Sequence, residues 1–194
     1  MTVVNFYSPN EREIVAEIRA WSAHALEKVS PHFNGLAPCP YAKKAWQENR
    51  VAIVFRYGGN QCLFNILSEF SDAIDLVLIV DQHTRQSSED FHEFLESMNE
   101  AISNGIFGDR DLWVMGFHPD DDSNDFVDDG TFEPHVNTPY SLTFVQRLSK
   151  VQEAADKLKK RGYYEAYFAE YDAAELFEKR ETLYRRLKNG NESS

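Results

Sequence analysis

One apolar run in the middle of the chain, residues 76–80 with an aspartate on each side, most constrains the fold. Five consecutive apolar residues between charged ones are typical of a central β-strand that is covered on both faces. Such a strand needs neighbours to complete its backbone hydrogen bonds. Further strands are therefore predicted at 50–57, 111–118 and 141–147, and the first of these ends at a Gly-Gly pair.

Helices are predicted between and around these strands. Ser8, Pro9 and Glu11 form the pattern of an N-terminal capping box, and the apolar stripe that follows reaches Val29. Other helices are expected at about 63–70, 87–104, 149–161 and 164–188. This alternation predicts an α/β class with a roughly four-stranded sheet, helices packed on it, and extra N- and C-terminal helices. We expect one globular domain over 1–190 and a frayed tail at 191–194.

The charge distribution excludes some classes of protein. The net charge is −12, and residues 61–140 alone hold 18 acidic and 2 basic residues. A chain this acidic is not expected to bind DNA or RNA through a sequence-independent basic surface. It is equally not expected to dock on anionic membranes. Its apolar runs of about five residues fall short of the roughly 20 that span a bilayer, so we expect a cytoplasmic protein. The acidic middle is interpreted as a solvated surface, with a cation site or a docking surface for a basic protein partner as alternatives.

Cys39 is the first candidate for chemistry, because prolines flank it and Lys43 and Lys44 follow. If Pro40 begins a helix, Cys39 is the N-cap, and its sulfur faces free backbone N–H groups at the positive end of the helix dipole. Each of these effects favours the thiolate, which is the nucleophilic and metal-binding form. The alternative is a half-buried capping residue without reactivity.

His118 is the second candidate, at the end of the strand predicted over 111–118. Ligands of open α/β sheets gather at the carboxyl ends of strands, where an imidazole can serve as general base or metal ligand. The alternative is a structural histidine that is hydrogen-bonded to a loop carbonyl.

The acidic loop that follows His118 suggests a divalent cation. Asp120 and Asp122 offer oxygen ligands at alternate positions, as Ca²⁺ and Mg²⁺ prefer. The EF-hand pattern fails, because Asp125 stands where its glycine belongs. A zinc site built from Cys39, His118 and His135 is an alternative, although no local spacing marks it.

Three segments in order resemble one protein family. The segments are Cys39-Pro40-Tyr41-Ala42, Gly116-Phe117-His118-Pro119, and Asn137-Thr138-Pro139-Tyr140-Ser141-Leu142 with Arg147 beyond. Together they resemble the small bacterial proteins grouped as domain of unknown function 1415, over roughly residues 12–155. Thr138 and Ser141 depart from that family's pattern. The resemblance implies site positions rather than a reaction: Cys39, His118, Asn137, Tyr140 and Arg147.

These observations lead to a hypothesis of a small enzyme with a thiol- or metal-dependent site, for which a divalent metal ion is the candidate cofactor. Cys39 would be the nucleophile or a metal ligand, His118 the general base or a ligand, and Arg147 the anchor for an anionic group of a small-molecule substrate. The turn from Asn137 to Tyr140 would complete the site. The rival hypotheses are a non-catalytic interaction protein and a metal-binding protein without catalysis.

Overall fold

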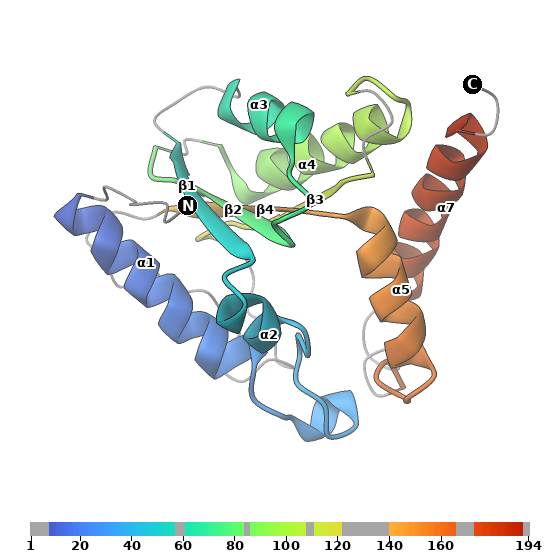
Figure 1. Cartoon of the computed structure of the whole chain (residues 1–194), viewed down its shortest axis with the longest axis horizontal. Coiled ribbons are helices and arrows are strands. Elements are labelled where there is room, and N and C mark those ends of the chain that lie inside the picture. The colour runs from blue at the N-terminus through green and yellow to red at the C-terminus, as the bar shows by residue number, and fades with distance from the viewer. Residues whose placement is uncertain are drawn as a thin grey trace.

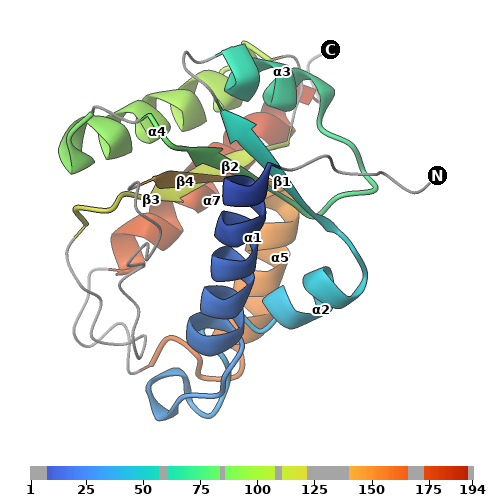
Figure 2. The same ribbon diagram turned by 90° about the vertical axis from the view of Figure 1, so that its left-hand side faces the viewer.

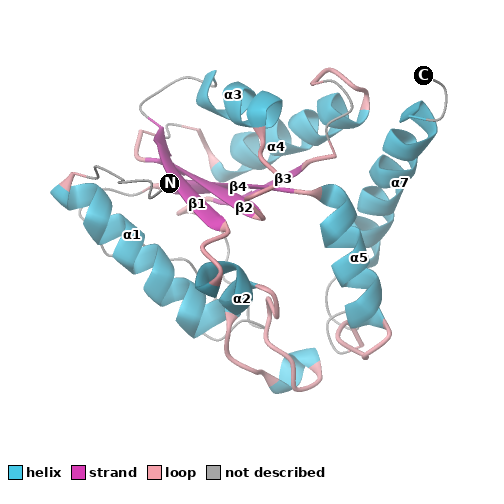
Figure 3. Ribbon diagram, viewed as in Figure 1, coloured by secondary structure: helices cyan, strands magenta, loops and turns pink. Residues whose placement is uncertain are grey.

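A mixed four-stranded sheet forms the centre of the computed structural model, which describes residues 8–56, 61–83, 86–107, 111–121, 140–165 and 173–191 (Figures 1 and 3). The strand order is β1-β2-β4-β3. The bounds are β1 Val51–Arg56, β2 Leu76–Asp81, β3 Trp113–Phe117 and β4 Ser141–Gln146. β1 and β2 are parallel, and β4 is antiparallel to both of its neighbours. β2 is the buried central strand that its apolar run predicted.

Helices cover both faces of the sheet (Figure 2). On one face, here the α4 face, lie α3 (Gln61–Glu69) and α4 (Ser88–Ser103). On the opposite α1 face lie α1 (Pro9–Trp21) and the short α2 (Ala42–Gln47). Alternate residues of the strands supply the two cores. The α4-face core contains Leu63, Leu67, Val77, Ile79, Phe91, Leu95 and Val114. The α1-face core contains Ile14, Ile18, Leu78, Val80, Tyr140, Leu142 and Phe144.

The N-terminal helix begins as the sequence predicts and ends earlier. Ser8 and Glu11 exchange the two hydrogen bonds of a capping box, of 2.5 and 3.3 Å. After Trp21 the helix widens into one π-helical turn, Ser22–Leu26, and the chain then leaves the axis. Val29 was predicted on the apolar stripe, but its side chain is 75% exposed because it lies beyond that turn.

The C-terminal helices form a separate layer beside β3. α5 (Leu148–Lys159) and α7 (Ala173–Asn191) enclose a small core of Trp113, Leu148, Leu183 and Leu187. Lys179 and Arg186 of α7 pair with Glu96 and Glu100 of α4, both at 2.8 Å. Part of the acidic middle of the chain is therefore neutralised within the molecule.

The predicted fold class is confirmed: an α/β structure with a four-stranded mixed sheet, helices on it, and N- and C-terminal helices. The strand and helix limits agree within about two residues, except for two helices: the N-terminal helix ends at Trp21 rather than near Val29, and the last helix runs from Ala173 to Asn191 in the described part of the chain. No described helix combines the length and the apolar character that crossing a membrane requires.

Candidate functional site

Cys39 is not the N-cap that the sequence predicted. α2 begins at Ala42, with Tyr41 in the cap position. The chain first makes a turn in which the Ala42 N–H donates to the Cys39 carbonyl at 3.1 Å. The N–H of Cys39 in turn donates to the carbonyl of Leu26, at 2.9 Å, at the end of the π-helical turn. This hydrogen bond to the π-helical turn holds Cys39 ahead of α2, outside the N-cap position of that helix.

The surroundings of the Cys39 thiol do not favour a thiolate. Burial raises its pKa, and this effect outweighs the backbone N–H groups of Ala42 and Tyr41, which lower it. The nearby carboxylate of Glu27 raises the pKa further. Within the described residues, no histidine is among the groups that act on the sulfur. The direction of the shift is opposite to that predicted from the sequence.

We therefore expect Cys39 to react slowly with alkylating reagents. At neutral pH, iodoacetamide should modify the folded protein more slowly at Cys39 than it modifies a free cysteine, whose pKa is about 8.5. Peptide mass mapping separates Cys39 from Cys62, and the same reaction in denaturant provides the control. Faster labelling of Cys39 in the folded protein than in denaturant would contradict this prediction.

His118 has both ring nitrogens occupied by hydrogen bonds. The backbone N–H of Asp120 donates to Nδ1 at 3.2 Å, so Nε2 carries the proton that it donates to the carbonyl of Gln86 at 3.1 Å. The buried ring also packs on Phe91 of α4, with centroids 5.7 Å apart. His118 is thus a structural histidine bonded to a loop carbonyl, the second of the two interpretations that the sequence left open.

Asp121 connects the end of β3 to the start of α4 through hydrogen bonds of its carboxylate. Its carboxylate accepts the backbone N–H of His118 at 2.7 Å, the Ser88 hydroxyl at 2.5 Å and Nε2 of His92 at 2.8 Å. Burial opposes ionisation, but these hydrogen bonds hold the pKa of Asp121 below its ordinary value. The sequence favoured a solvated acidic surface, with a cation site as an alternative, and did not predict this role of Asp121.

The sequence-predicted pair of Cys39 and His118 is not brought together. Cys39 is bonded to the turn that continues α1, whereas His118 packs on Phe91 on the opposite face of the sheet. The two side chains are therefore not placed to share a proton or to bind one metal ion. The reason is topological: the chain between them crosses from one face of the sheet to the other.

Tyr140 also points away from His118. Phe117 pairs with Leu142 in the antiparallel register, so His118 and Tyr140 project to opposite faces. Tyr140 is fully buried on the α1 face, and its hydroxyl donates to Glu17 at 2.8 Å. Burial, and then this carboxylate, raise the pKa of the phenol far above its ordinary value.

The remaining predicted site residues are dispersed. Arg147 follows the far end of β4, so the seven residue steps from Tyr140 place it about 24 Å away at about 3.4 Å per residue. Asp120 is exposed, with its carboxylate 3.7 Å from Nδ1 of His118. Asn137, His135 and Asp122 lie outside the described residues. Among the described ranges, no group of three or more His, Cys, Asp and Glu side chains could hold a metal ion.

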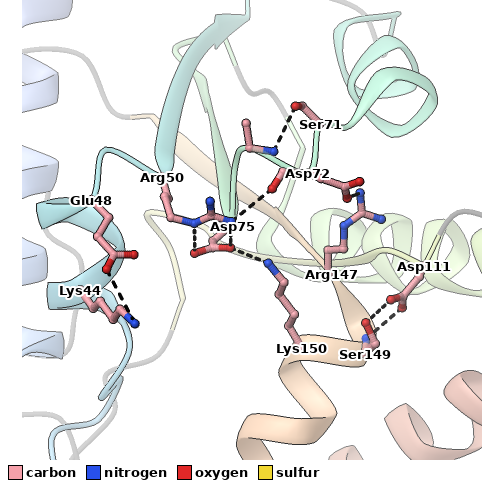
Figure 4. A network of polar contacts seen from close by, with 11 residues as sticks. Lys44, Glu48, Arg50, Ser71, Asp72, Asp75, Asp111, Arg147, Ser149 and Lys150 are labelled. Atoms are coloured by element: carbon pink, nitrogen blue, oxygen red, sulfur yellow. Dashed lines mark hydrogen bonds and ion pairs between the residues drawn. The ribbon is translucent and has the colours of Figure 1, made fainter.

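Arg147 instead belongs to a cluster of charges where β1 and β2 begin and β4 ends. We call Arg50, Asp72, Asp75, Arg147 and Lys150 the amino-edge cluster (Figure 4). The strand register explains it: Leu76 is opposite Val51 on one side and Gln146 on the other. The residue before each parallel strand and the residue after β4 therefore lie in line across the sheet. Three segments far apart in sequence thus contribute to one surface.

Asp75 is the fixed centre of the amino-edge cluster. Arg50 donates to both of its carboxylate oxygens, at 2.6 and 2.7 Å, and the Lys150 ammonium donates at 2.8 Å. The Arg50 guanidinium holds the pKa of Asp75 well below its ordinary value, and Lys150 adds to this effect. Asp75 therefore stays ionised at any physiological pH.

Arg147 and Asp72 form an ion pair whose two members differ strongly in solvent exposure. The Arg147 guanidinium lies over the ring of Phe70, 5.3 Å from its centroid, and its side chain is only 17% exposed. Its partner, the Asp72 carboxylate, belongs to a side chain that is 90% exposed. Arg50 donates to the backbone carbonyl of Asp72 at 3.2 Å, which holds the turn independently of the Asp72 side chain. The cation is thus fixed by packing, while its acidic partner is fixed only by the ion pair.

The N-terminus of α5 adds positive potential to the same cluster. Arg147 occupies the N-cap position of α5, and Lys150 lies in the first turn. Asp111 accepts the N–H of Ser149 at 2.9 Å and also its hydroxyl. Helix geometry leaves the other first-turn N–H groups without an intrahelical acceptor, and the helix dipole makes this end attractive to anions.

Comparisons with family models, with curated proteins and with solved structures found no match for this chain. The resemblance to domain of unknown function 1415 therefore stays a prediction, as do the site positions that it implies.

Proposed function

We propose that this protein binds a small anionic ligand at the amino-edge cluster. The observation that carries the proposal is the asymmetry of the Arg147–Asp72 pair, a largely buried and packed cation facing an exposed carboxylate. Arginine is suited to such a role, because its planar guanidinium binds carboxylate and phosphate groups with two parallel hydrogen bonds. The role of Arg147 as an anchor for an anion, expected from the sequence, is retained without Cys39 or His118.

The energetics favour exchange of Asp72 for a ligand. An ion pair with an exposed partner is worth about 0–1 kcal/mol, so releasing the Asp72 side chain costs little. The hydrogen bond from Arg50 to the Asp72 carbonyl keeps the turn in place when the side chain leaves. The Lys150 ammonium in the first turn of α5 then attracts the incoming anion.

A catalytic role has less support than binding. The thiol of Cys39 is held in its protonated form, and both nitrogens of His118 are engaged. The acidic helix α4 already pairs with α7, which takes up part of the charge that a basic protein partner would contact.

Titration with inorganic phosphate tests the proposal, with chemical shifts of backbone amides as the measurement and low ionic strength to limit screening. We expect saturable shifts at the start of α5 and in the turn around Asp72. Arg147→Gln should reduce the affinity by about tenfold or more, because it removes the bidentate anchor. Lys157→Gln, on the same helix in an exposed pair with Glu153, is the matched control and should bind like the wild type.

Asp72→Asn separates ligand binding from a purely structural role. Removal of the competing carboxylate should raise the affinity for phosphate by up to about fivefold, since the pair is worth up to about 1 kcal/mol. If Arg147 only stabilises the turn, this substitution should leave phosphate binding unchanged. Absence of saturable shifts in both the wild type and Asp72→Asn would overturn the proposal.

A further inference from the structure

We draw no further inference here: the strongest candidate, the side-chain cluster at the carboxyl ends of β1 and β2, where Arg56 and Asp81 pair at 2.7 Å and the amide nitrogen of Gln82 is buried, carries nothing because the two charges neutralise each other and nothing in the described residues shows what would bind there.

Discussion

Replacement of Asn99 by alanine is expected to lower the free energy of unfolding by about 2–6 kcal/mol. The Asn99 side chain is buried on α4 and makes two hydrogen bonds to the backbone of Val114 in β3. Its Nδ2 donates to the Val114 carbonyl, and its Oδ1 accepts the Val114 N–H, both at 2.8 Å. Alanine would leave both backbone groups buried without a partner, and each such group costs about 1–3 kcal/mol.

Chemical denaturation with circular dichroism as the readout measures this loss. Ser97→Ala, at an exposed position of the same helix, is the control and should change the stability by less than about 0.5 kcal/mol. A loss below about 1 kcal/mol for Asn99→Ala would mean that water or a rearranged side chain satisfies Val114.

The location of Asn99 explains why the loss of this one side chain is expected to lower the stability so strongly. Among the strands of the described part of the chain, β3 lies at the edge of the sheet, and no described strand lies beside its outward N–H and C=O groups. The amide of Asn99 takes the place of that missing strand at Val114, and α4 delivers it from above the sheet. The same contact protects the edge from pairing with another chain.

The elements of this fold were predictable because their signals are local. Five apolar residues between Asp75 and Asp81 suffice to indicate a buried strand, and the Ser8–Glu11 capping box marks the first turn of a helix. Val29 shows where local reasoning fails. Its position on the apolar stripe is regular, but a π-helical turn ends the helix before it, and nothing in the periodicity announces that turn.

The site was less predictable because it depends on contacts between distant segments. Cys39 and His118 each occupy a position at which reactive residues are common, yet only the topology decides that they lie on opposite faces. Two sequence signals could have located the important residues. Asn99 is polar at a position that the apolar stripe of its helix places toward the core. Arg50 and Asp75 immediately precede parallel strands, which places them at one edge.

Asp81→Leu is expected to lower the free energy of unfolding by about 3–5 kcal/mol. Asp81 and Arg56 face each other across β2 and β1, and their carboxylate and guanidinium groups lie 2.7 Å apart. Both side chains are largely buried, at 10% and 17% exposure. Removal of the carboxylate leaves the charge of Arg56 in a poorly solvated position, and breaking a buried pair in this way costs about 3–5 kcal/mol.

The double variant Arg56→Met with Asp81→Leu distinguishes a buried charge from lost packing. Replacement of both members by apolar residues should recover most of the stability, because desolvation of the pair offsets much of its Coulombic attraction. A shortfall of about 1 kcal/mol should remain, since Asp81 also accepts the N–H of His83 at 3.0 Å. If the double variant is no more stable than Asp81→Leu alone, the cost arises from packing at the end of β2 rather than from the charge of Arg56.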